Sequence, residues 1–66
     1  MEIFLNGTPH SLPEPCTIAQ LIQTLGYVGK RVAVERNGDI VPRSAHEQTT
    51  LATRDQIEIV VAVGGG

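Results

Sequence analysis

The chain has 66 residues and a mass of 7.1 kDa, enough for one small domain. Hydrophobic residues make up 41% of the sequence and charged residues 18%, a balance typical of a folded domain rather than a disordered segment. Cys16 is the only cysteine, which excludes a disulfide framework and any cysteine-rich zinc or iron–sulfur site.

The formal net charge of −2 argues against nucleic-acid binding, which requires a basic face. Lys30 and Arg31 form the only adjacent basic pair. No apolar run approaches the roughly 20 residues of a membrane span, and no basic region precedes the first apolar stretch. We therefore expect neither a signal peptide nor a membrane partner. The single thiol fits a cytoplasmic location.

Two short strands are predicted at the start of the chain. Residues 2–6 alternate, so that Ile3 and Leu5 share one face and Phe4 lies on the other. Asn6-Gly7 favours a two-residue hairpin turn. A second strand is then predicted at residues 10–12, antiparallel to the first.

One helix is predicted over residues 18–25. Thr17 is placed to cap its first turn, and Gln20 three residues later completes a capping box. Gly26 is a suitable stop because glycine tolerates a left-handed backbone. The apolar stripe has the i, i+3, i+4, i+7 spacing of a helix and comprises Ile18, Leu21, Ile22 and Leu25.

Three further strands are predicted in the second half of the chain. Residues 32–35 and 39–41 flank the turn dipeptide Asn37-Gly38. Residues 44–51 are expected to be irregular, with one short helical turn. After a turn at Arg54-Asp55, residues 56–63 form the longest and most apolar strand.

This order predicts an α+β fold of the β-grasp, or ubiquitin-like, type, with a mixed sheet of about five strands packed on one main helix. The strongly apolar first and last strands are expected to be parallel neighbours at the centre of the sheet. We expect residues 1–63 to form the domain and residues 64–66 to form a flexible C-terminal tail.

The tail Gly64-Gly65-Gly66 is the chemically suggestive feature of the sequence. Without a Cβ, a glycine arm can enter a narrow channel and leaves its terminal carbonyl carbon unhindered. The Gly66 carboxylate would need activation by ATP to become an acyl donor. This chain has no Gly-rich loop followed by Lys-Ser or Lys-Thr, so that ATP would be bound by a partner enzyme. A merely frayed chain end is the alternative.

The sequence resembles the ThiS family, the sulfur carrier proteins of thiamine biosynthesis, over nearly its whole length. The resemblance is carried by the terminal glycines, by residues 1–7 (MEIFLNG), by residues 17–22 (TIAQLI) and above all by residues 32–44 (VAVERNGDIVPRS). The family ends in Gly-Gly, matched here by Gly65 and Gly66, and Gly64 is additional.

The resemblance implies a carrier that is not itself an enzyme and binds no cofactor. An adenylating enzyme similar to the ubiquitin-activating enzyme would use ATP to convert the Gly66 carboxylate to an acyl-adenylate. Sulfur from a cysteine desulfurase relay would then leave a thiocarboxylate, from which thiazole synthase takes the sulfur. The alternatives are a molybdopterin-synthase small subunit, a ubiquitin-like protein modifier, and a binding module whose tail has no role.

A partner surface is predicted on the face of the sheet away from the helix. Phe4, Val60 and Ala62 would form an apolar patch there if the first and last strands pair, and such patches usually mark docking surfaces. The alternative is that loop residues 44–51 cover them. Arg43 is a further candidate, either for orienting an acidic residue or phosphate of a partner or for capping its own loop.

The other reactive side chains have simpler interpretations. Cys16 precedes the helix cap, where a small packing residue is expected rather than a sulfur-handling group. His10 and His46 are expected at the surface, since they are far apart in sequence and lack companion ligands. Asp55 and Glu58 are expected in a turn and on a solvent-facing side of a strand, rather than as an acid–base pair.

Overall fold

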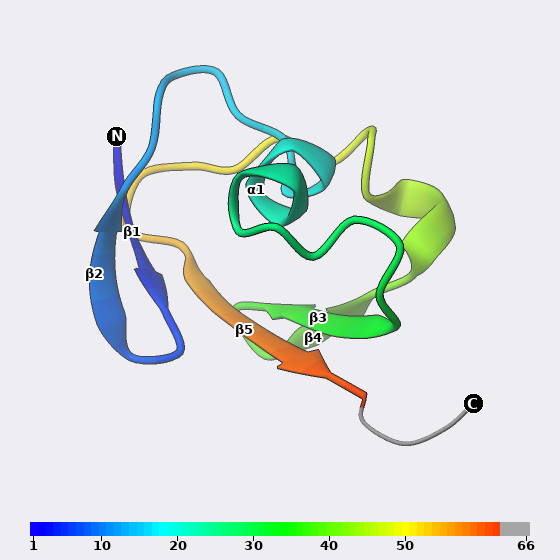
Figure 1. Cartoon of the computed structure of the whole chain (residues 1–66). Coiled ribbons are helices and arrows are strands. Elements are labelled where there is room, and N and C mark those ends of the chain that lie inside the picture. The colour runs from blue at the N-terminus through cyan, green and yellow to red at the C-terminus, as the bar shows by residue number, and fades with distance from the viewer. Residues whose placement is uncertain (63–66) are drawn as a thin grey trace.

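A computed structural model describes residues 1–62 of the chain as a single sheet crossed on one face by one α-helix (Figure 1). The sheet order is β2-β1-β5-β3-β4. This arrangement confirms the predicted β-grasp fold. The elements are β1 (Glu2–Leu5), β2 (Thr8–Ser11), α1 (Ile18–Thr24), β3 (Val32–Arg36), β4 (Asp39–Val41), the 3-10 helix η1 (Arg43–Ala45) and β5 (Gln56–Val61).

Strand β5 is the central strand of the sheet, and β1 lies beside it, as predicted. They run parallel, with Phe4 opposite Gln56 and Leu5 opposite Ile57. On its other side β5 pairs antiparallel with β3 over five residues. The strand ends at Val61, short of the predicted 56–63, and the predicted last residue Val63 lies outside the described residues.

Both predicted hairpin turns form. Asn6 and Asn37 have φ values of 51° and 52°, and the glycines that follow them are also at positive φ, as a type I′ turn requires. The first turn is so tight that β2 begins at Thr8, two residues before the predicted start. Pro9 is accommodated inside β2 because that strand lies at the edge of the sheet.

Helix α1 has the predicted capping box. The backbone N–H of Gln20 donates to Oγ1 of Thr17 at 3.1 Å, and the Thr17 N–H donates to Oε1 of Gln20 at 2.8 Å. Leu25 is the C-cap, and Gly26 follows it with a φ of 78°. Because every one of these bonds joins residues close in sequence, the helix could be predicted within one residue.

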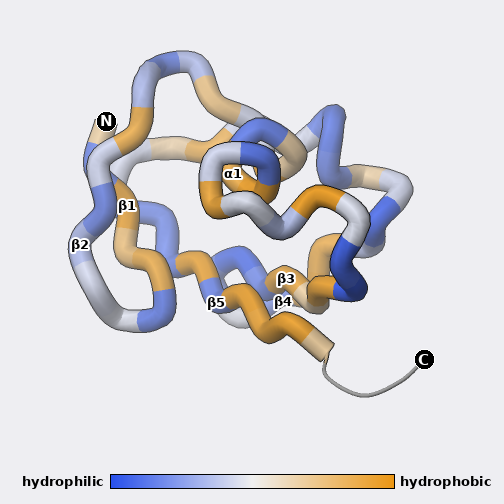
Figure 2. Tube along the Cα trace, viewed as in Figure 1, coloured by the Kyte–Doolittle hydropathy of each residue, from blue (hydrophilic) through white to orange (hydrophobic). Residues whose placement is uncertain are grey.

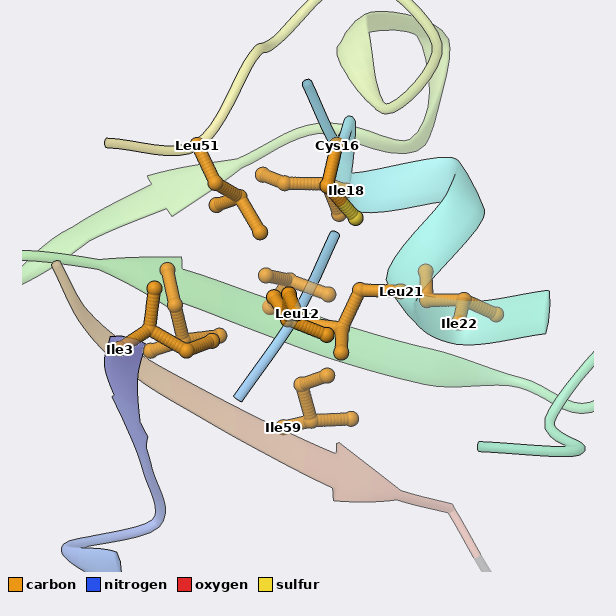
Figure 3. Close-up of a cluster of buried hydrophobic side chains, with 10 residues drawn as sticks. Ile3, Leu12, Cys16, Ile18, Leu21, Ile22, Leu51 and Ile59 are labelled. Atoms are coloured by element: carbon orange, nitrogen blue, oxygen red, sulfur yellow. The ribbon is translucent and has the colours of Figure 1, made fainter. Parts of the chain in front are cut away.

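The core lies between α1, the sheet and the loop that precedes β5 (Figure 3). Figure 2 shows hydrophobic residues along β5 and on α1. Cys16 is buried beside the start of α1, which confirms its predicted packing role. The buried cluster comprises Ile3, Leu12, Cys16, Ile18, Leu21, Ile22, Val34, Leu51, Ile57 and Ile59.

The segment from η1 to β5 is tied to the start of α1. The N–H of Ile18 donates to the carbonyl of Thr49, and the N–H of Ala19 donates to the carbonyl of His46. The prediction that His46 lies at the surface is wrong: its side chain is buried, with Nε2 3.1 Å from the carbonyl oxygen of Val41.

No helix in residues 1–62 is long and apolar enough to cross a membrane.

Candidate functional site

The candidate site starts where β5 ends and the glycine tail begins. At this point Val61 is paired with Val32, and the N–H of Ala62 donates to the carbonyl of Arg31 at 2.8 Å. The predicted working residue Gly66 and the tail residues Gly64 and Gly65 lie outside the described residues. The structure therefore describes the end of β5 and Ala62, after which those residues follow in the sequence.

An asparagine side chain holds β5 in place beyond the end of β1. Oδ1 of Asn6 accepts from the N–H of Ile59 at 2.9 Å, and its Nδ2 donates to the carbonyl of the same residue at 3.3 Å. The side-chain amide thus takes the place of one more residue of a neighbouring strand. The dipeptide Asn6-Gly7 predicted the turn, but no local signal indicated this bond to a residue 53 positions away.

A buried carboxylate secures the other end of β5. Asp55 immediately precedes the strand and is only 6% exposed. Its Oδ2 accepts from Nε of Arg36 and from the backbone N–H of Ala52, both at 2.8 Å, and its Oδ1 accepts from Nδ2 of Asn37 at 3.1 Å. The predicted turn position of Asp55 is confirmed, and its role is to clamp the β3–β4 turn to the start of β5.

Two opposing effects act on the pKa of Asp55. Burial raises it, because the charged carboxylate loses its hydration. The hydrogen bonds from Ala52, Asn37 and Arg36, together with the positive charge of Arg36, outweigh burial and hold the pKa below its ordinary value. The carboxylate is therefore ionised near neutral pH and acts as an acceptor rather than as a proton donor.

The register divides the patch predicted from Phe4, Val60 and Ala62. Phe4 lies opposite Gln56, so Val60 is four residues, or about 13 Å, farther along the sheet. The prediction of one continuous patch is therefore wrong. Val60 lies instead opposite Ala33 of β3; Val60 is 64% exposed, and Ala33 and Ala62 are also exposed. Phe4 is half-buried.

Two carboxylates lie between these apolar positions. Glu35 of β3 and Glu58 of β5 are direct cross-strand partners on the outer face, the face of the sheet opposite α1. Glu58 is exposed, as predicted, and Glu35 is half-exposed. Like charges placed directly opposite each other on neighbouring strands are destabilising. The two carboxylates also make the surface beside Val60 and Ala33 acidic. The sequence did not reveal it, because the two residues are on different strands.

The alternative that residues 44–51 cover the outer face is wrong. That segment packs against the beginning of α1, through the bridge between Thr17 and Thr50 and the bond from the N–H of Leu51 to the carbonyl of Cys16. Figure 1 shows the segment on the same side of the sheet as α1. Arg43 begins η1 on this helical side, so it belongs to a different surface from Val60.

The remaining candidates do not assemble a reactive centre in the part of the chain that is described. The Cys16 thiol is 2% exposed, and burial raises its pKa. His10 is half-exposed on the edge strand β2. Among residues 1–62, no three His, Cys, Asp or Glu side chains are grouped so as to hold a metal ion.

The sequence and the structure were both compared with those of known proteins, and both match proteins named ThiS. The sequence model of the ThiS family matches residues 3–66. The chain is 42% identical to the sulfur carrier protein ThiS of Bacillus subtilis over 50 residues, which cover 76% of each protein. The crystal structure of the thiamine biosynthesis protein ThiS from Geobacter metallireducens matches with a TM-score of 0.84 and 30% identity over the full length of both chains.

A second kind of relative is much longer. The chain is 42% identical over all 66 residues to a thiazole synthase of Magnetococcus marinus and 38% identical to one of Paramagnetospirillum magneticum. It spans only 20% of the length of each. A domain like this one is therefore part of those two synthase chains. Because the family match covers almost the whole sequence and the fold agrees with a solved member, the chain belongs to the ThiS family.

Proposed function

We propose that this chain is a sulfur carrier protein of thiamine biosynthesis, with the carboxylate of Gly66 as the group that carries the sulfur. The family match is the observation that supports this most strongly. The geometry agrees with it. Strand β5 is paired on both sides and clamped at its start by Asp55, so a rigid central strand leads into the four residues that follow Ala62.

The chemistry requires two displacements at the tail. A carboxylate oxygen of Gly66 attacks the α-phosphorus of ATP and releases pyrophosphate, which leaves an acyl-adenylate. A sulfur atom at the oxidation level of sulfide then attacks the carbonyl carbon, the bond to AMP breaks, and a thiocarboxylate remains. ATP is bound and used by a partner adenylating enzyme similar to the ubiquitin-activating enzyme, and the sulfur comes from relay proteins.

The chain itself acts as a co-substrate rather than as an enzyme in this proposal. Its thiol at Cys16 is buried and therefore poorly placed to relay sulfur. Thiazole synthase is the proposed receiver of the sulfur. The two longer relatives support this, because a carrier-like domain within a thiazole synthase chain places donor and receiver together. We propose a cytoplasmic location, where the thiol and thiocarboxylate stay reduced.

The outer face of the sheet is the proposed docking surface for one of these enzymes. Its described apolar positions are Val60, Ala33, Ala62 and the exposed Ile40, which pairs with Glu35, with Phe4 as a separate, half-buried contact. Val60→Glu should abolish partner binding and leave the fold intact, because that side chain points to solvent. Thr53→Glu, in an exposed turn, is the control for the added charge. Unchanged binding by Val60→Glu would remove this face from the interface.

Intact-mass measurement tests the carrier function directly. The protein is incubated with the adenylating enzyme, ATP and a sulfur source, and Bacillus subtilis ThiS serves as the positive control for the enzymes. We expect the mass change of one oxygen replaced by sulfur, and no change when Gly66 is deleted. Circular dichroism should show that the deletion leaves the domain folded, because the core described for residues 1–62 is complete without Gly66.

Two other results would contradict the proposal. High-mass conjugates with lysine-containing proteins would identify a ubiquitin-like modifier instead. No mass change in the presence of enzymes that do convert the Bacillus protein would rule out the carrier function.

A further inference from the structure

A second surface of the domain is basic, although the chain as a whole is acidic. It is a hollow of about 610 Å³ between α1, the loop of residues 25–31 and η1. Three cationic side chains line it: Lys30 and Arg31 from the loop, and Arg43 from η1. These are three of the five Lys and Arg residues in the protein, which has a net charge of −2. The basic residues are therefore concentrated at this hollow.

The charges of the hollow are not neutralised within the described part of the chain. Lys30, Arg31 and Arg43 are exposed, and no carboxylate of residues 1–62 lies within ion-pair distance of them. The ammonium of Lys30 lies 6.0 Å from the centre of the Tyr27 ring, which is an attractive but weak contact. Glu47 also lines the hollow, and it is the one acidic residue there.

The hollow also presents apolar surface. Val28 lines it and is 69% exposed, the highest value among the exposed large hydrophobic residues of the described chain. Tyr27 and Val32 contribute half-buried surface around it. A surface that combines exposed cations with an exposed valine suits a ligand that is both acidic and apolar.

The position of the hollow links it to the tail. Arg31, which lines it, accepts the hydrogen bond from Ala62, and Val32 is the cross-strand partner of Val61. The loop between α1 and β3 runs beside the end of β5 in Figure 1. Any enzyme that takes the tail into its active site must therefore bring the entrance of that site close to Lys30 and Arg31.

We propose that this basic hollow binds an acidic and partly apolar protein segment at the entrance through which thiazole synthase receives the tail. The proposal rests on the carrier function proposed above and adds a contact that is separate from the outer face of the sheet. A small anion such as phosphate is the weaker occupant. Its charge would be held only by long exposed side chains from two separate elements, with Glu47 close by.

Charge-reversal variants test the proposal through binding to purified thiazole synthase from the same organism. Arg31→Glu and Arg43→Glu change the charge on the loop and on η1 by two units each. We expect each to weaken binding at least about fivefold at low salt, with the difference shrinking at about 0.5 M salt. Arg54→Glu is the matched control, because it makes the same charge change in an exposed turn before β5. It should bind within about twofold of the wild type.

Arg31→Lys, which keeps the charge, should bind as the wild type does. Circular dichroism confirms that each variant is folded. Wild-type affinity for the synthase in both Arg31→Glu and Arg43→Glu would overturn the proposal. Inorganic phosphate that shifts the Lys30 and Arg31 amide resonances with a sub-millimolar dissociation constant would also overturn it, because that result would identify a small-anion site. A wild-type chain that neither binds the synthase nor acquires sulfur would instead refute the proposed carrier function.

Discussion

The buried hydrogen bonds of Asp55 lead us to expect a large loss in the free energy of unfolding when one carboxylate oxygen is replaced by an amide nitrogen. In Asp55→Asn the side chain keeps its shape but loses its charge and becomes a donor on one side. Its Oδ2 position faces Arg36 and Ala52, and its Oδ1 position faces the amide nitrogen of Asn37. Asn37 cannot simply reverse its amide, because its oxygen already accepts from the N–H of Gln56 at 2.9 Å. Either orientation of the new amide therefore leaves two donors facing each other.

The expected cost follows from those contacts. Hydrogen bonds to a charged group contribute about 1.5–3 kcal/mol, and an unsatisfied buried donor costs about 1–3 kcal/mol. We expect Asp55→Asn to lower the free energy of unfolding by about 2–3 kcal/mol. A domain of this length has about 3–10 kcal/mol in total, so the loss is a large fraction of it. The midpoint of thermal unfolding should fall by about 10–20 °C.

Urea unfolding followed by far-ultraviolet circular dichroism measures this effect. Glu58→Gln is the matched control, because it removes the same charge from an exposed position on the next strand. It should change the free energy of unfolding by less than about 0.5 kcal/mol, or raise it slightly by relieving repulsion from Glu35. If Asp55→Asn is as stable as Glu58→Gln, the hydrogen bonds of Asp55 do not stabilise the fold.

Four smaller predictions concern single side chains. The lowered pKa of Asp55 means that its contribution to stability is complete above the pKa of the unfolded chain, about 3.9, and is lost as the pH falls through the folded-state value. Urea titrations at decreasing pH should therefore show the wild type and Asp55→Asn converging in acid, and a constant gap would contradict this. Thr17→Ala should lower the free energy of unfolding by about 1 kcal/mol through loss of the cap, and an unchanged urea midpoint would argue against the capping box. Gly26→Ala should cost a similar amount, about 1 kcal/mol, because φ is 78° while the space around it is open; thermal unfolding measures it, and a neutral effect would show that the turn relaxes. The Cys16 thiol should react with a thiol reagent only as the domain unfolds, so rapid labelling in the absence of urea would contradict its burial.

Short-range features of this protein were predictable from the sequence. The capping box of Thr17 and Gln20, the stop at Gly26 and the two Asn-Gly turns all depend on residues within a few positions of each other. Their conformations follow from local hydrogen bonds and from backbone sterics. Those local interactions act whatever the rest of the chain does, which is why the predicted element order agrees with the structure.

Contacts between distant residues were predicted less well. The strand neighbours were correct, but Phe4 proved to be opposite Gln56 rather than near Val60. His46 was expected at the surface and is buried, with its ring Nε2 3.1 Å from the carbonyl oxygen of Val41. The first error concerns the register between two strands and the second the packing of a loop residue, and the alternation of apolar and polar residues specifies neither.

The sequence by itself determined the order of the elements, the parallel pairing of the first and last strands, and the glycine tail with its family resemblance. Only the tertiary structure decided the register of β5, the bonds from Asn6 and Asp55 that hold it, and the gathering of Lys30, Arg31 and Arg43 around one hollow. The reason is physical. Helix and turn preferences act within a few residues, whereas the register and the surfaces it creates are set by burying the core residues of all the elements at once.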